Sequence, residues 1–159
     1  MMLRAMDKPD WKTDLRSCFE DLQVIDRCRG EAVAQFDRFC DYVAEPAFEA
    51  LAEEFDRYGM KGRSSWTKGS SVEFDVRFPR SKEDQFQYVL WLPKQAVELK
   101  LKLTLRGRKA PGAPMEEKTR PFLDTASAKD ILGIDRDALA QDVVARYKKF
   151  LYETAVLAD

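Results

Sequence analysis

The stretch "SVEFDVRF", residues 71–78, alternates strictly between apolar and polar side chains. This period of two places successive side chains on opposite faces of a strand, so it predicts a half-buried β-strand. The expected inner row is Val72, Phe74, Val76 and Phe78, and the expected outer row is Glu73, Asp75 and Arg77. A strand with one apolar face needs neighbouring strands and a covering layer of other elements.

The same alternation occurs further along the chain. "QFQYVLWL", residues 85–92, predicts a strand with Val89 and Trp91 on its outer face, and "VELKLKLTLRGRK", residues 97–109, predicts a strand with an outer row that includes Lys100 and Lys102. A weaker strand is expected near "GRSSWT", residues 62–67. Because the intervening segments are short, consecutive strands should be antiparallel neighbours. The sequence therefore predicts a four-stranded antiparallel meander.

Helical periodicity precedes the strands. A stripe with steps of four and three residues predicts a helix from residue 10 to 28 that is capped by Asp10 and interrupted at Gly30. The stripe consists of Trp11, Leu15, Cys18, Leu22 and Ile25. The pattern then resumes from residue 33 to 58, and Pro46 can begin or kink a helix there. These amphipathic helices are expected to cover the sheet.

The region after the strands is expected to contain a loop and further helix. Residues 107–121 hold three prolines and two glycines and predict a mobile surface loop. Ser127 and Asp130 form a capping box, and Asp135 caps a final helix. The expected fold is an α+β two-layer sandwich with N-terminal helices, a four-stranded antiparallel meander and a C-terminal helix. We expect one domain over residues 1–159, with residues 1–9 disordered.

The composition narrows the classes of function. The chain contains no histidine, which removes the commonest metal ligand and general base, and its three cysteines form no CxxC pair. We expect Cys18, Cys28 and Cys40 to be small buried side chains. No apolar run is long enough for a membrane helix, and the N-terminal residues lack the apolar core of a signal peptide. The sequence thus predicts a cytoplasmic protein without membrane contact, cofactor, metal site or catalytic residues.

The charge is distributed unevenly along the chain. Residues 1–56 carry a net charge of −7, residues 57–109 of +8 and residues 110–159 of −2, although the whole chain has a net charge of −1. An exposed aromatic residue on a polar sheet face is typical of an interface. The outer sheet face is therefore the predicted interaction surface, with Trp91 as its apolar anchor. The candidate residues are Trp66, Arg77, Val89, Trp91, Lys100, Lys102, Arg106, Arg108 and Lys109.

Three functions remain open at this point. The favoured one is a non-catalytic bacterial interaction or adaptor protein that forms a homodimer or binds a protein partner through this face. The alternative is a module that binds single-stranded nucleic acid, with phosphates on the basic residues and a base stacked on Trp91 or Trp66. A third is a small hydrolase or metal-dependent enzyme that uses Glu73, Asp75 and Glu98.

Three segments carry a family resemblance: "EPAFEALAEEFDRYG" (45–59), the strands containing "SVEFDVRF" and "QFQYVLWLP", and "SAKDILGIDRDALAQDVVARYKKFL" (127–151). In this order they resemble a family of small uncharacterised bacterial proteins, over about residues 31–151. The resemblance implies the order helix, sheet, helix and a bacterial cytosolic setting. It implies no activity and no site residues.

Overall fold

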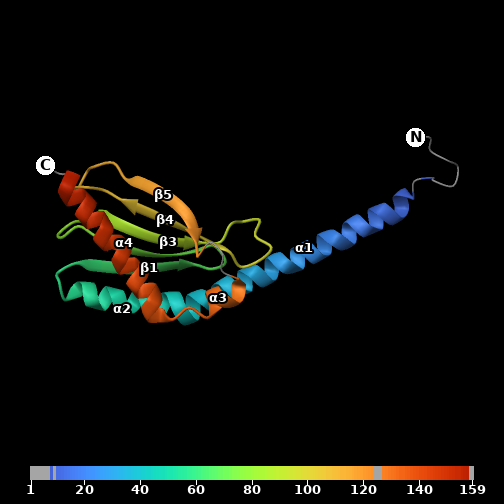
Figure 1. Cartoon of the computed structure of the whole chain (residues 1–159), viewed down its shortest axis with the longest axis horizontal. Helices are drawn as coiled ribbons and strands as arrows, with labels where there is room; N and C mark the ends of the chain where they lie inside the picture. Colours follow the sequence, from blue (N-terminus) through green and yellow to red (C-terminus); the bar gives the residue numbers. More distant parts are fainter. Residues whose placement is uncertain (1–7, 9, 124–126, 158–159) are drawn as a thin grey trace.

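The computed structural model describes residues 8, 10–123 and 127–157. Apart from Lys8, the expected disorder of residues 1–9 concerns residues outside this described part. The fold is α+β, with N-terminal helices, an antiparallel sheet and C-terminal helices in that order. The helices that cover the sheet lie on one of its faces, and the N-terminal helix extends far beyond it (Figure 1).

The first helix, α1 (Trp11–Phe39), is continuous through Gly30, so the predicted interruption there is wrong. Its start is as expected, because Asp10 accepts hydrogen bonds from the backbone N–H and the hydroxyl of Thr13. A glycine inside a helix costs only about 1 kcal/mol, and the packing of Ala32 and Phe36 into the core holds the helix on the C-terminal side of Gly30. The N-terminal part of α1 projects away from the body of the molecule (Figure 1).

A short π-helix connects α1 to the next helix. It is η2 (Cys40–Ala44), and α2 (Glu45–Asp56) follows it directly. Pro46 has no N–H to donate to the carbonyl of Tyr42, four residues earlier, so the regular α-helical bonding cannot continue. The Tyr42 carbonyl instead accepts a hydrogen bond of 2.7 Å from the guanidinium Nε of Arg136. The π-helical turn thus leaves a backbone carbonyl free to accept a hydrogen bond from Arg136, which is far away in the sequence.

The sheet has five antiparallel strands in sequence order, rather than the four predicted. The strands are β1 (Lys61–Thr67), β2 (Ser71–Arg77), β3 (Asp84–Trp91), β4 (Leu101–Gly107) and β5 (Glu116–Phe122). The tight turn between β1 and β2 requires Gly69, which has a φ of 71° and donates its N–H to Asp37 of α1 at 2.6 Å. The weak strand expected near residues 62–67 is confirmed as β1.

The additional strand, β5, begins within the region predicted to be a loop, residues 107–121, and extends one residue beyond it to Phe122. Residues 116–121 are all exposed, because β5 is an edge strand paired only with β4. Pro121 is tolerated there since an edge strand has one unpaired side. The start of the β4 prediction is also corrected: residues 97–100 precede the strand, and Val97 is exposed rather than part of the inner row.

Two C-terminal helices complete the fold. The predicted capping box of Ser127 and Asp130 starts α3 (Ala128–Leu132), and α4 (Arg136–Leu157) crosses the sheet on the same side as α2 (Figure 1). On α4, Asp142 accepts a 2.5 Å hydrogen bond from the buried Tyr88 hydroxyl of β3. The inner faces of β2, β3 and β4 form the core together with α2, α4 and the C-terminal part of α1.

Candidate interaction surfaces

The outer face of the sheet, the face opposite the helices, holds most of the predicted interaction residues. Strand alternation and the observed register place five of them there: Arg77, Val89, Trp91, Lys102 and Arg106. The remaining basic residues lie next to β4 rather than in it: Lys100 precedes the strand, and Arg108 and Lys109 follow it. Trp66 is on the other face, where its indole N–H donates to Asp37 of α1 at 3.3 Å.

The apolar anchor of this face is engaged within the sheet. The indole N–H of Trp91 donates a 2.9 Å hydrogen bond to the hydroxyl of Thr104, and the Lys102 ammonium lies 5.5 Å from the centre of the Trp91 ring. Val89 is 7% exposed although it belongs to the outer row. Trp91 is half-buried. These contacts leave less apolar surface for a partner than the sequence pattern predicts.

The basic residues of the sheet have acidic neighbours. Four of the predicted cations lie within 4.0 Å of a carboxylate: Arg77 with Asp84, Lys100 with Glu98, Arg106 with Glu117, and Arg108 with Glu83. The net charge of +8 over residues 57–109 is therefore reduced locally by pairing, including pairing with Glu117 from β5. A phosphate backbone placed here would compete with carboxylates for the same cations.

One carboxyl group on the outer face is buried. Asp75 is 2% exposed, and its Oδ2 lies 3.4 Å from the Arg63 guanidinium. Its Oδ1 has no hydrogen-bond partner among the described residues. Burial raises the pKa of Asp75 from 3.8 to about 7, and Glu73 and Asp84 act in the same direction, while Arg63 opposes them. The group can therefore carry a proton near neutral pH.

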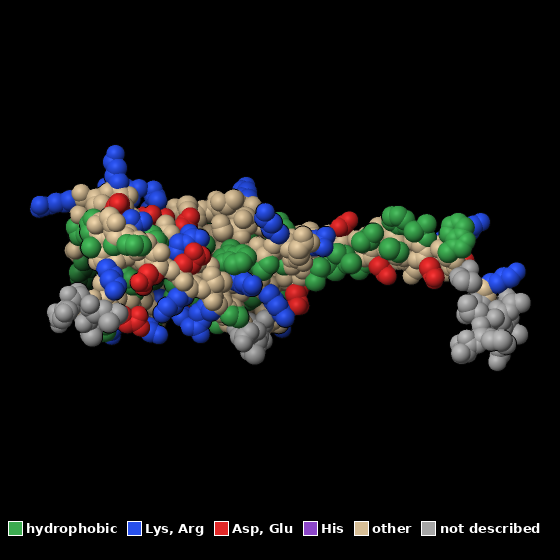
Figure 2. Space-filling model, turned by 90° about the horizontal axis from the view of Figure 1, so that it is seen from above, with side chains coloured by type: hydrophobic (Ala, Val, Ile, Leu, Met, Phe, Trp, Pro, Cys, Tyr) green, Lys and Arg blue, Asp and Glu red, His purple; other side chains and the backbone are tan. Residues whose placement is uncertain are grey.

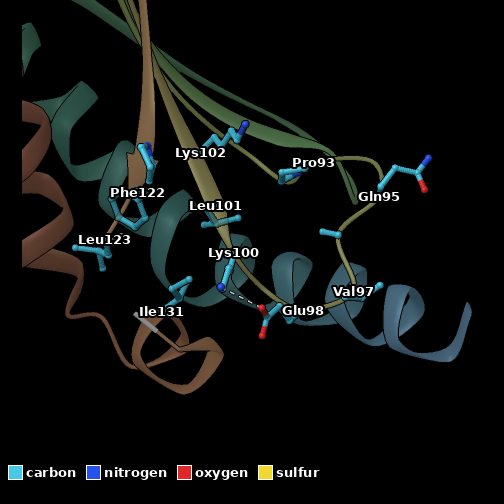
Figure 3. Close-up of a pocket in the computed structure, with 12 residues that line it drawn as sticks. Pro93, Gln95, Val97, Glu98, Lys100, Leu101, Lys102, Phe122, Leu123 and Ile131 are labelled. Carbon is cyan, nitrogen blue, oxygen red and sulfur yellow. Dashed lines mark ion pairs between the residues drawn. The ribbon is translucent and has the colours of Figure 1, made fainter. Parts of the chain in front are cut away.

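A hollow of about 500 Å³ lies at the end of the sheet, beside the segment that leads into β4. Its apolar walls include Pro93, Leu101, Phe122 and Ile131, and the Glu98–Lys100 ion pair lies at its edge (Figure 3). Lys100 and Lys102 are the predicted surface residues that line it. It brings no second acidic side chain to Glu98, so the predicted grouping of Glu98 with Glu73 and Asp75 is not present in its lining.

A row of exposed apolar side chains lies on α1. We call residues 11–29 the arm, and within it Trp11, Leu15, Cys18, Leu22 and Ile25 the arm stripe. Trp11 is 65% exposed, Leu15 50% and Leu22 47%, and every residue from 11 to 24 is exposed. Figure 2 shows hydrophobic side chains along the part of the helix that stands clear of the body. The arm stripe thus covers no part of the sheet, contrary to the sequence-based expectation.

The sequence contained a signal for this surface. The spacing of the arm stripe was visible, but an amphipathic helix next to a half-buried sheet normally packs on that sheet. The prediction that all three cysteines are buried holds for Cys40 alone. Cys18, in the arm stripe, is exposed, and Cys28 is intermediate. Among the described residues of α1, those that are buried in the core, Ala32, Phe36 and Phe39, all follow Gly30.

The described residues include no group of three or more cysteine and carboxylate side chains arranged to hold a metal ion. Within the same part of the chain, no helix has both the length and the apolar character needed to cross a membrane. No protein-family model, curated protein or solved structure matches this chain. The resemblance to small bacterial proteins stays a prediction, and function is inferred from the surfaces described above.

Proposed function

We propose that this chain is a non-catalytic interaction protein and that its main binding surface is the arm stripe, which receives an amphipathic helix of a partner. The observation that carries the proposal is the exposure of Trp11, Leu15 and Leu22 on one side of a projecting helix. Burial of apolar surface gains roughly 25 cal/mol per Å². A partner that covers three large side chains would therefore contribute several kcal/mol.

The stability of the arm also supports a partner. A helical segment without tertiary contacts is marginal in water, and within the described part of the chain the arm is partly buried only from Ile25 onward. Its apolar positions follow steps of four and three residues, the spacing of a coiled-coil seam. A second helix with the same spacing could pack along the whole arm stripe and hold the arm helical.

The outer face of the sheet is a weaker candidate for the binding surface than the arm stripe. Its tryptophan is hydrogen-bonded within the sheet and its arginines lie beside carboxylates. Binding of single-stranded nucleic acid through Lys102 and Arg106 would require the Arg106–Glu117 pair to open. The nucleic-acid alternative therefore has less support than helix binding by the arm.

Photo-crosslinking in cells that express the full chain tests the proposal. A benzophenone amino acid replaces Leu22, which lies in the arm stripe, or Gln23, which is exposed beside it. We expect a covalent adduct, with this chain or with another protein, from position 22 and little or none from position 23. Absence of an adduct at position 22, or equal yields at the two positions, would overturn the proposal.

A further inference from the structure

We propose that the partner helix is the arm of a second copy of this chain, and that the two arms pack antiparallel. This inference rests on the proposed function, because it identifies the occupant of the arm stripe. Three features of α1 support it: the point where the seam becomes buried, the charged residue that interrupts the seam, and the charges on either side of it.

The arm stripe is one half of a longer seam. Continuing its steps of four and three residues leads through Arg29 to Ala32, Phe36, Phe39 and Val43, which are all buried in the core. The C-terminal half of the seam is therefore covered by the body of the same chain. The N-terminal half has the same pattern but is exposed up to residue 24, and only Ile25 and Arg29 at its end are half-buried. This N-terminal half runs from Trp11 to Arg29, about 28 Å at 1.5 Å per residue.

Arg29 is the one charged residue in this seam, and it sits where the exposed half ends. In an antiparallel pair, each a position faces a d position of the other helix. The register that places Leu15 opposite Ile25 and Cys18 opposite Leu22 also places Trp11 opposite Arg29. A guanidinium can stack on an indole ring, so the charged position meets a compatible side chain.

This register also fits the shape of the molecule. With Trp11 of one copy opposite Arg29 of the other, each arm ends where the partner's buried residues begin at Ala32. The projecting segment is paired over its full length, and the two bodies lie at opposite ends of the paired arms. The arm stands clear of its own body, which leaves room for a second helix beside it (Figure 2).

Charges beside the seam favour the antiparallel direction. On one flank, Lys12 faces Asp26 of the second copy twice by symmetry, and Asp26 also lies 3.8 Å from Arg29 of its own helix. On the other flank, Asp14 faces Cys28 of the second copy. Asp21 faces Asp21 of the second copy, which is the one like-charge contact of this arrangement. A parallel pair would instead bring Asp21 to Asp26 twice and Arg29 to Arg29 within the seam. The parallel pair therefore has more like-charge contacts and loses the Lys12–Asp26 attraction.

Solution mass provides the first test. We expect the purified full chain, 18.4 kDa, to have twice that mass in a concentration-dependent equilibrium measured by sedimentation. Leu15→Asp should weaken the dimer by about 100-fold or more, because it places a charge in the seam. Gln23→Asp adds the same charge at a position that points away from the seam, as Arg16 does, and should change the dimer constant little. Cooperative thermal unfolding of the body checks folding, and its midpoint should persist because Leu15 lies outside the core, whereas helical signal from the unpaired arm should decrease.

Crosslinking provides the test of direction. In a Cys18→Ser, Asp14→Cys variant, a short bismaleimide should join residue 14 to Cys28 of the second copy. The same two positions in one helix are about 21 Å apart, so a link between them must be intermolecular. Arg16→Cys, in place of Asp14→Cys, points away from the seam and should give little of this product.

The outcomes separate this inference from the proposed function. A monomer at all accessible concentrations overturns self-pairing, and the helix-binding function then stands if position 22 still forms adducts with another protein in cells. A dimer that lacks the 14–28 link, and whose wild-type form oxidises to a Cys18–Cys18 disulfide, overturns the antiparallel arrangement. A dimer insensitive to Leu15→Asp overturns the inference as well, because another surface must then hold it together.

Discussion

Asp75 combines burial with an incomplete set of partners. It lies in a row across the outer face with Arg63 on β1 and Gln87 on β3, and among the described residues Arg63 alone supplies a positive charge within 4.0 Å of it. Its raised pKa means that the folded chain retains a proton that the unfolded chain releases. Between pH 3.8 and about 7, the unfolded state therefore binds fewer protons, and the contribution of this group to stability decreases as pH rises.

Asp75→Asn should remove this pH-dependent loss. Relative to wild type, the variant should gain stability from acid to mildly alkaline pH, by on the order of 4 kcal/mol over the whole interval. Urea unfolding at about pH 4.5 and about pH 8 measures the difference. Glu73→Gln is a second variant for the same measurement. Loss of the Glu73 charge should lower the pKa of Asp75 and so reduce the pH range over which Asp75 destabilises the folded state. A difference between Asp75→Asn and wild type that is constant with pH would contradict the assignment.

At the level of elements, alternation predicts the strands that have one apolar face and fails for those that do not. Residues 71–78 and 85–92 have a buried row, so β2 and β3 could be predicted from the residues alone. In β5, the row that faces the helix side of the sheet carries Lys118 and Arg120, and both are exposed. Its formation depends on hydrogen bonds with β4, a nonlocal cause that composition does not reveal.

Two glycines should respond in opposite directions to substitution by alanine. Gly30 lies in α1, and a Cβ there meets nothing within 4 Å, so Gly30→Ala should stabilise the helix by about 1 kcal/mol. Gly107 ends β4, and a Cβ there would overlap the Phe150 ring of α4. Gly107→Ala should therefore destabilise the chain.

Thermal unfolding followed by circular dichroism compares the two variants with wild type. We expect the unfolding midpoint to rise for Gly30→Ala and to fall for Gly107→Ala. A lower midpoint for Gly30→Ala would show that the helix needs flexibility at this position, against the continuous α1 described here.

For the whole molecule, the sequence predicts an interaction protein, and the structure changes the surface that best supports that function. The arm stripe and the outer face were both visible as patterns of apolar residues. Their roles depend on what covers each pattern, and that depends on where α1 leaves the body. The sequence pattern predicts an exposed Trp91, but this side chain is half-buried and donates a hydrogen bond to Thr104. The pattern predicts that Trp11 packs on the sheet, but Trp11 is 65% exposed.

Hydrogen exchange should separate the arm from the body in the intact protein. Amides of residues 14–25 depend on a helix without core contacts in one copy, so they should exchange rapidly in dilute protein and slowly once arms are paired. Amides of β2 and β3 are central in the sheet and should exchange slowly at every concentration. Measurement by mass spectrometry across a concentration series, with Leu15→Asp as the unpaired reference, compares the two regions. Arm protection that is high in dilute Leu15→Asp would mean that the helix is stable alone, and the argument that marginal stability requires a partner would fail.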